Sequence, residues 1–566
     1  MLRHSSCTLL CCAALVSSVA CGSKKQPPKP RPPTSDAAVT VNNKPRLVVL
    51  IVVDQLPSWS FDKQHTFMKS GIGRLLRGGT FYPRAEYPYA ITYTAPGHVA
   101  LATGAPPAVS GILANGWYQR SLGRSVSAVA DKEHPIMLVN PAGDTAKNKR
   151  KRAYGASAAR LKVTGVGDWL RAQTDGKGKA IAVSLKDRAA NFVLGQRPNL
   201  AIWYDAGQAA MTTSSWYAKQ PPPWLLDLAK KKPVSANFNY VWKLASPELT
   251  ARITGNPDDA PGEGGIYGLT NTFPHSLAKA SAAAALRATP VGPLITTQTA
   301  IAAVHGEQLG KDDIPDLLAV SYSSHDYAGH TWGQESWERF DLLLHIDKQI
   351  GVLLDELDRV VGKDRYTVVL TSDHGVTRVV EQSKQHKRAA HRITTDALMI
   401  PLTKACEGVL GKGKWIAAGS ASMVYMTAEF HKLPSPRKDK ALAAMVAALK
   451  AVKGIAYAKR TDQLAGNCAT RRGIDALVCR SLAPNESGDI FVAVAPNSIF
   501  SGEYKTGTTH GSPNPDDRFV PIIVHTPGGK ARVVKGPVST LRIAPTLARM
   551  LDIKPAKTAP APALVP

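Results

Sequence analysis

Residues Leu47 to Val53 read LVVLIVV, an unbroken run of β-branched and other apolar side chains. Such a run is typical of a strand that is buried on both faces, as the strands of parallel sheets are. Helical patterns, the clearest at 335–361, separate it from similar runs at 180–185, 317–322, 366–370 and 520–525. The alternation predicts an α/β fold with a largely parallel central sheet flanked by helices.

Two intervals depart from this alternation. Residues of about 195–310 are rich in Trp, Ala and Pro and lack long β-branched runs, so we expect a cap over the functional site. Residues of about 405–505 hold short strand-like runs around an alanine-rich helix, which predicts a small α+β insertion. The catalytic domain is thus expected over 47–555, followed by a Pro/Ala-rich tail at 556–566.

The N-terminus has the pattern of a secretory signal. A single basic residue, Arg3, precedes the apolar run 9–19, which ends in small residues before Cys21. The run is too short to span a bilayer, and it therefore predicts a cleaved signal peptide over 1–20.

The residues around Cys21 resemble a bacterial lipoprotein cleavage site, with a small residue before the cysteine and Gly22-Ser23 after it. We expect acylation of Cys21 and a Pro/Lys-rich extended linker over 21–46. The protein would be exported and held by its lipid in the periplasm or at the cell surface, at the outer membrane in a cell that has one. Ordinary signal cleavage without a lipid is the alternative.

Length and composition favour a large folded enzyme. The 566 residues are 44% hydrophobic, which is enough for a sizeable core. The net charge of +27 is spread along the chain without an aromatic-interleaved basic motif, which favours solvated basic loops over nucleic-acid binding. A positive field would still attract anions such as phosphate esters.

Few cysteines remain for structural use. Four of the seven lie at or before position 21, and the others are Cys406, Cys468 and Cys479. At most one disulfide can form. The short separation of Cys468 from Cys479 predicts that these two pair and that Cys406 is free.

Ionisable side chains follow four of the predicted strands, at the sheet edge where α/β proteins bind ligands. They are Asp54, the pair Lys186 and Arg188, Asp326, and the pair Asp373-His374. Carboxylate oxygen with imidazole nitrogen is a donor mixture that suits zinc. With His330 and His510 there are six candidate ligands, enough for two ions at three ligands each.

The order of the motifs LIVVDQLP, TYTAPGH, SLKDR, HDYAGH, TSDHG and THGSP resembles the alkaline phosphatase superfamily. The resemblance is to its threonine-nucleophile phosphomonoesterases, relatives of the nucleotide pyrophosphatase/phosphodiesterases, and it spans about 47–553. It implies two Zn²⁺ ions per chain that flank the nucleophile. One would be held by Asp326, His330 and His510, and the other by Asp54, Asp373 and His374.

Residue chemistry alone leaves both Thr92 and Thr94 open as the nucleophile. The resemblance favours Thr94, because the family places a histidine and an asparagine at the positions of His98 and Asn115. It also implies that Asn115 donates hydrogen bonds to a phosphoryl oxygen. Thr94 would lie at the start of a helix, where free backbone amides favour a phosphate.

Lys186 and Arg188 are expected to select the substrate. One residue separates them in a segment predicted to be strand-like, so both would point to one side and present two cations to one anion. A phosphomonoester dianion carries one more charged oxygen than a diester, and the pair therefore favours monoesters. The predicted reaction is hydrolysis of small-molecule phosphate monoesters through a covalent phosphothreonine.

Several alternatives differ in a checkable feature. A nucleotide pyrophosphatase/phosphodiesterase would keep the same metals and Thr94. A sulfatase would need a Cys-x-Pro-x-Arg type motif, which the chain lacks. A cofactor-independent phosphoglycerate mutase would normally be cytosolic with a serine nucleophile. A non-catalytic surface lipoprotein would be expected to have lost some of the six ligands.

Overall fold

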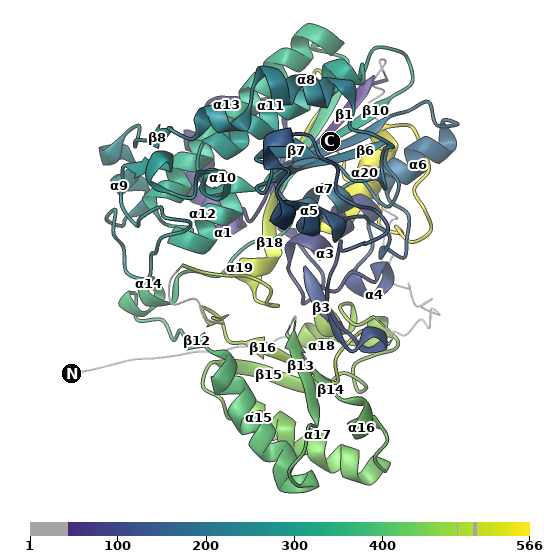
Figure 1. The fold of residues 1–566 in the computed structure, drawn as a ribbon, viewed down its shortest axis with the longest axis vertical. Helices are drawn as coiled ribbons and strands as arrows, with labels where there is room; N and C mark the ends of the chain where they lie inside the picture. Colours follow the sequence, from purple (N-terminus) through teal and green to yellow (C-terminus); the bar gives the residue numbers. More distant parts are fainter. Residues whose placement is uncertain (1–43, 421, 484, 502–506, 566) are drawn as a thin grey trace, which may run out of the picture. The chain divides into compact units, whose positions relative to one another are not determined.

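The centre of the fold is a ten-stranded sheet with the order β19-β2-β18-β11-β1-β10-β5-β6-β7 and with β20 paired to β2 (Figure 1). The computed structural model describes residues 44–420, 422–483, 485–501 and 507–565. The predicted signal peptide, the acylation site and nearly all of the linker lie outside the described residues. No described helix has both the length and the apolar character that a membrane crossing needs.

Five neighbouring strands form the parallel centre, and all of them except β6 were predicted. They are β11 (Tyr366–Thr371), β1 (Leu47–Val53), β10 (Asp316–Tyr322), β5 (Ala180–Ser184) and β6 (Leu200–Asp205). Every residue of β1 is fully buried, which explains its lack of polar alternation.

The two faces of β1 pack against different helices, because successive side chains of a strand point in opposite directions. The face that carries Leu47, Val49 and Ile51 packs with α1 (Ser58–Gln64), α2 (Gly71–Arg77), α8 (Pro223–Lys231), α11 (Val291–Gly306), α12 (Ser324–Trp332) and α13 (Trp337–Leu357). The face that carries Val48 and Leu50 packs with α3 (Thr94–Thr103), α6 (Val166–Gln173), α7 (Asp187–Phe192) and α20 (Ile543–Met550).

The sheet is mixed at its edges. The run predicted as a strand at 520–525 is β18 (Phe519–His525), and it is antiparallel to both β11 and β2 (Gly79–Glu86). The remaining edge strands are β7 (Ala210–Thr212), β19 (Arg532–Val533) and β20 (Val538–Ser539). An apolar run indicates burial but carries no information on strand direction.

The interval 195–310 is not an insertion throughout. Its first part supplies β6 and β7, and its last part is α11, which packs on the sheet. Between them lie α8, β8 (Val241–Trp242), α9 (Pro247–Thr254), β9 (His275–Ser276) and α10 (Ala282–Ala285). Short strands that contain Trp and Tyr do not produce the long β-branched runs by which a sheet strand is recognised.

A second, four-stranded sheet lies where the α+β insertion was expected. Its order is β13 (Ile416–Ser420), β14 (Met423–Met426), β16 (Ile490–Val494) and β15 (Ile455–Arg460). It has its own apolar core with α15 (Thr395–Leu410) and α17 (Ser435–Lys450), so this unit begins about ten residues before the predicted boundary. Cys468 and Cys479 form the predicted disulfide at α18 (Gly473–Cys479), and Cys406 is a buried free thiol.

The C-terminal Pro/Ala-rich segment packs against the domain. Leu564 is fully buried, and its backbone N–H donates to the Thr546 hydroxyl of α20 at 2.7 Å. The remaining elements are α4 (Pro107–Ser110), β3 (Gly116–Gln119), β4 (Arg124–Ser127), α5 (Ala146–Ala153), α14 (Val380–Gln385), β12 (Arg392–Ile393), α16 (Ala428–His431), β17 (Ile499–Phe500) and α19 (Pro515–Arg518).

Candidate functional site

The ends of β1, β5, β10 and β11 bring the predicted site residues to one edge of the sheet. Asp54 directly follows β1, Asp326 lies in the first turn of α12 after β10, and Asp373 follows β11 by two residues. The ammonium group of Lys186, after β5, lies 2.8 Å from Asp54 Oδ2 and 2.5 Å from Asp326 Oδ2. All four side chains are buried, so their charges interact with little screening by water.

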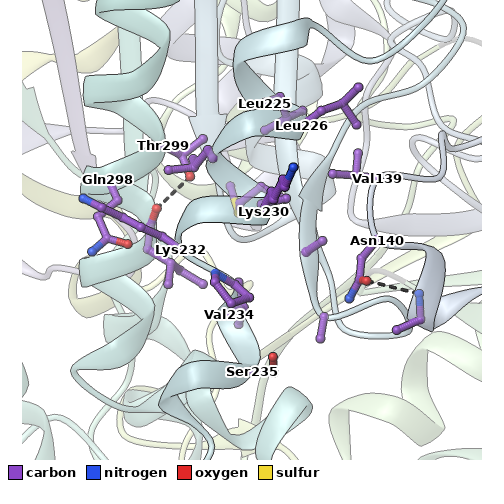
Figure 2. Close-up of a pocket in the computed structure, with 18 of the residues that line it drawn as sticks. Val139, Asn140, Leu225, Leu226, Lys230, Lys232, Val234, Ser235, Gln298 and Thr299 are labelled. Atoms are coloured by element: carbon purple, nitrogen blue, oxygen red, sulfur yellow. Dashed lines mark hydrogen bonds between the residues drawn. The ribbon is translucent and has the colours of Figure 1, made fainter.

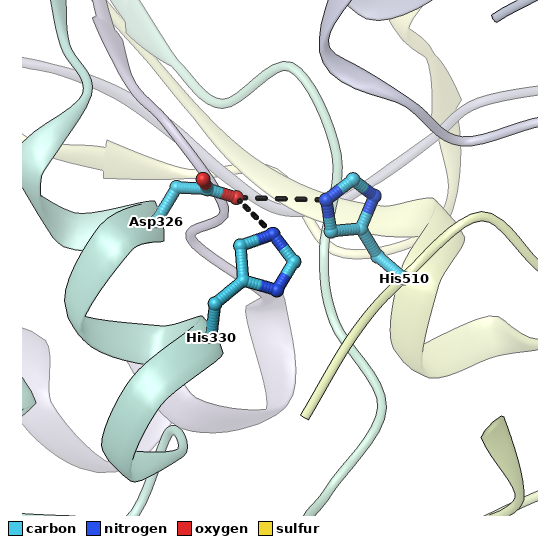
Figure 3. Close-up of side chains that lie close together, drawn as sticks. All are labelled: Asp326, His330 and His510. Carbon is cyan, nitrogen blue, oxygen red and sulfur yellow. Dashed lines mark ion pairs between the residues drawn. The ribbon is translucent and has the colours of Figure 1, made fainter. Parts of the chain in front are cut away.

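Asp326, His330 and His510 form the first of two ligand groups (Figure 3). Asp326 Oδ1 lies 3.3 Å from His330 Nε2 and 3.5 Å from His510 Nε2. The Nδ1 atoms of the two imidazoles lie within hydrogen-bond distance of backbone carbonyls, His330 of Thr508 O and His510 of Thr92 O. A histidine that donates from Nδ1 keeps an Nε2 lone pair for a metal ion.

Asp54, Asp373 and His374 form the second group. His374 Nε2 lies 3.3 Å from Asp373 Oδ2 and 3.6 Å from Asp54 Oδ1, and His374 Nδ1 lies 2.9 Å from the Gly375 carbonyl oxygen. Two carboxylate oxygens, Asp54 Oδ1 and Asp373 Oδ2, are buried and accept no hydrogen bond from any described residue. Buried oxygens of this kind need a partner of another type.

The residues present fit two divalent cations. Burial and the neighbouring carboxylate of Asp373 raise the pKa of Asp54 well above its usual range, and burial, with Asp326 adding to it, raises the pKa of Asp373 to about 7. Three buried carboxylates share one lysine, which leaves negative charge that is costly to bury. Each group offers three ligands that donate through nitrogen or oxygen, as the protein ligands of catalytic zinc sites do.

Thr94, rather than Thr92, directs its hydroxyl toward the two groups. Thr94 is the first residue of α3, and its Oγ1 atom lies 3.4 Å from Lys186 Nζ and 3.5 Å from His374 Nε2. The Thr92 hydroxyl instead donates to the backbone oxygen of Ser512 at 3.0 Å. Asn115 Oδ1 accepts the backbone N–H of Ala95 at 2.9 Å, which leaves the Asn115 NH₂ group as a donor beside the nucleophile candidate.

The expectation that Lys186 and Arg188 lie in a strand-like segment is wrong. Lys186 precedes α7, and Arg188 lies in the first turn of that helix instead of a strand-like segment. Lys186 points inward, whereas the Arg188 guanidinium donates to Asp187 Oδ1 at 3.1 Å and its side chain is 27% exposed. An acidic residue in the first turn favours the helix start. Arg188 still interacts electrostatically with Asp326 and Asp54, the two carboxylates that Lys186 contacts.

Sequence reasoning missed Gln55. Its backbone N–H donates to Asp373 Oδ1 at 3.1 Å, and its side-chain Nε2 donates to Asp326 Oδ1 at 2.7 Å. Gln55 therefore holds one carboxylate from each ligand group. Its backbone φ of +65° makes both hydrogen bonds possible. No sequence pattern predicts that a glutamine will adopt this left-handed backbone conformation.

The close contact of Gly97 in α3 with the Asp373 loop carries a prediction. A Cβ atom at Gly97 would lie 2.2 Å from the backbone oxygen of Asp373, so Gly97→Ala must displace the helix or the loop. We expect the free energy of unfolding to fall by about 1–3 kcal/mol, as overpacking usually costs. Chemical denaturation measures the change, and metal analysis should show a loss at the second group.

The matched control is Gly408→Ala in α15, where nothing lies within 4 Å of the added atom. Alanine favours a helix over glycine, so this variant should be neutral or slightly stabilised. If the two variants had the same free energy of unfolding and the same metal content, the close contact between Gly97 and Asp373 would be contradicted.

A cavity of about 420 Å³ lies elsewhere, between α8, β7 and α11 (Figure 2). Its lining is mainly apolar, with Leu225, Val234 and Ile295 among its residues. None of the predicted site residues lines it, so its size says nothing about the chemistry at the sheet edge.

Comparison with known proteins agrees with this geometry. The family model described as type I phosphodiesterase / nucleotide pyrophosphatase matches residues 48–516. The chain belongs to this family, which confirms the predicted superfamily and, at this level, the prediction of a phosphoesterase.

The relatives include named alkaline phosphatases. Alkaline phosphatase PafA of Elizabethkingia meningoseptica is 30% identical over 517 residues, which cover 90% of this chain and 92% of that protein. Alkaline phosphatase PhoV of Synechococcus elongatus is 34% identical over 341 residues, or 59% of this chain and 60% of that protein. The crystal structure of wild-type PafA superposes with a TM-score of 0.83 at 29% identity, over 92% of this chain and 98% of that chain.

Proposed function

We propose that the protein is a zinc-dependent phosphomonoesterase that hydrolyses small-molecule phosphate monoesters through a phosphothreonine on Thr94. The observation that carries the proposal is the position of the Thr94 hydroxyl. It lies at the first residue of α3, 3.4 Å from the Lys186 ammonium and beside both groups of potential metal ligands. The similarity to alkaline phosphatases supports the same activity.

The residues of the chain bind and orient the phosphoryl group. The Asn115 NH₂ group, the Lys186 ammonium and the backbone N–H of Thr94 at the start of α3 donate to its oxygens. Thr94 releases its hydroxyl proton to solvent as Oγ attacks phosphorus, the ester P–O bond breaks, and the alcohol leaves with a proton taken from solvent. Water then attacks the phosphothreonine and releases phosphate and Thr94. Bound zinc would neutralise charge on the attacking and leaving oxygens.

Each of the two displacements inverts the configuration at phosphorus, so hydrolysis should proceed with overall retention. A diesterase is the second candidate, and the description of the matching family model favours it. It would use the same Thr94 and the same ligands. The two candidates differ in whether a third charged phosphoryl oxygen is recognised.

Lys186 and Arg188 form different ion pairs, and this difference sharpens the test between a monoesterase and a diesterase. Lys186 forms ion pairs with two ligand carboxylates, so its removal would also disturb the metal groups. Arg188→Ala is the cleaner change, because the only ion pair of the Arg188 guanidinium with a described residue is the one with Asp187, which is in neither ligand group. We expect kcat/KM to fall about 10- to 100-fold for a monoester and much less for a diester, as a charge-assisted hydrogen bond is worth roughly 1.5–3 kcal/mol.

Assays with p-nitrophenyl phosphate and bis-p-nitrophenyl phosphate on one preparation measure both effects. The metal content of Arg188→Ala should equal that of the unaltered protein. Equal losses on both substrates would favour the diesterase.

The cellular location is also a proposal. The sequence favours export and lipid attachment at Cys21, at the cell surface or in the periplasm. Mass spectrometry of the mature N-terminus would show a lipid-modified Cys21, whereas an unmodified Cys21 thiol or another N-terminal residue would refute the anchor.

A further inference from the structure

Three cations surround Tyr327, which follows the ligand Asp326 in α12. The Lys186 Nζ atom lies 5.5 Å from the centre of the Tyr327 ring, and the Arg287 Cζ atom lies 4.8 Å from the same centre. The phenol of Tyr327 also interacts electrostatically with Arg188. Lys186 contacts Thr94, so Arg287 is separated from the phosphoryl site only by one tyrosine ring.

Arg287 is a half-buried cation without an acidic partner. Within the described part of the chain, no carboxylate lies within ion-pairing distance of its guanidinium, whereas most arginines this deeply placed pair with one. Toward the residues that the structure describes, only two of its five N–H groups donate: Nε–H to Ala284 O at 3.0 Å and one terminal N–H to the Tyr327 hydroxyl at 3.2 Å.

The Arg287 guanidinium lies between two aromatic rings. Its Cζ atom lies over the Tyr327 ring and over the Tyr267 ring, 4.9 Å from the centre of the latter, and Tyr267 is 41% exposed. Two cation–π contacts and the two hydrogen bonds restrict the positions that the side chain can take. A guanidinium with unused N–H groups can bind a carboxylate or a phosphate through two hydrogen bonds.

We propose that Arg287, with Tyr267 and Tyr327, binds a second anionic group on the leaving group of the substrate. The preferred phosphomonoesters would then carry a carboxylate or another phosphate beyond the ester oxygen. The inference rests on the proposed monoesterase function and specifies its substrate class. It assigns a role in recognition to a part of the 195–310 interval.

Matched substrate pairs test the inference. The pairs are phenyl phosphate with 4-carboxyphenyl phosphate, and propyl phosphate with 2-carboxyethyl phosphate, so that two distances to the carboxylate are sampled. Arg287→Met keeps the aliphatic stem between the tyrosines and removes the charge. Relative to the unaltered protein, kcat/KM for a carboxylated member should fall about 10- to 100-fold more than for its neutral partner.

The control is Arg252→Met, which removes an exposed arginine of α9 and should change neither member of either pair selectively. Arg287→Lys should recover part of the selectivity, since it restores the charge without the fork. Selective loss on either pair supports the inference, whereas equal changes on both members of both pairs overturn it.

A second measurement uses the unaltered protein, so it does not depend on whether a variant folds. In the unaltered protein, the preference for the carboxylated members should shrink as salt is added, because added ions screen the contact. A ratio that does not depend on salt overturns the inference. If the protein hydrolyses none of the four esters, the proposed function fails, and the inference fails with it.

Discussion

Thr94→Ala should reduce kcat/KM for phosphomonoesters by about four orders of magnitude or more. The substitution removes the only hydroxyl that the proposed reaction uses as a nucleophile, and losses of this size follow when a covalent catalyst loses its nucleophile. The Thr94 hydroxyl lies within 3.5 Å of both Lys186 and His374, so no neighbouring alcohol could take its place without moving the helix. Steady-state assays with p-nitrophenyl phosphate measure the loss.

Thr94→Ser is the matched control, because it keeps the hydroxyl and loses only a methyl group. It should retain most of the activity and form a phosphoserine that quenched-flow mass spectrometry can detect. If Thr94→Ala kept even a tenth of the activity, the covalent mechanism would be wrong.

Chelation of divalent metal should reduce hydrolysis by about a thousandfold or more and lower the melting temperature. Without cations, the buried carboxylates of Asp54 and Asp326 pair with the single ammonium group of Lys186, and the repulsion among Asp54, Asp326 and Asp373 is only partly compensated. The metal ions also supply several kcal/mol of charge stabilisation to a phosphoryl transfer. Elemental analysis should find two zinc ions per chain, and added zinc should restore both properties.

His374→Ala should lower the metal content by about one ion per chain, since it removes one ligand of the second group. His386→Ala, which removes an exposed histidine after α14, is the control and should leave the content unchanged. Fewer than one divalent ion per chain after zinc supplementation would refute both ligand groups.

The sequence predicts most of the central fold and the gathering of acidic residues at one edge of the sheet, because both follow from a local rule. The division of the six candidate ligands into two groups came only from the motif resemblance. An acidic residue at the end of a buried parallel strand, such as Asp54 or Asp373, must lie at the edge where the other strands end. The histidines are harder, and His510 joins its group only through the motif resemblance, since no regular spacing links it to Asp326.

Other features depend on geometry that residue type does not encode. The apolar run of β18 is equally compatible with either strand direction, and only its neighbours make it antiparallel. Helix α7 begins one residue after Lys186. Residues two positions apart share a face in a strand but not in a helix. Tertiary packing decides both cases.

The hydrogen bonds of Gln55 give the two ligand groups a common support. Its backbone N–H and its side-chain amide bind Asp373 and Asp326, one carboxylate from each group, so neither carboxylate can reorient without affecting the other. Occupancy of one group by a cation would thus preorganise the other. Thermodynamic linkage makes this effect reciprocal, and zinc uptake by the two groups should therefore be positively cooperative.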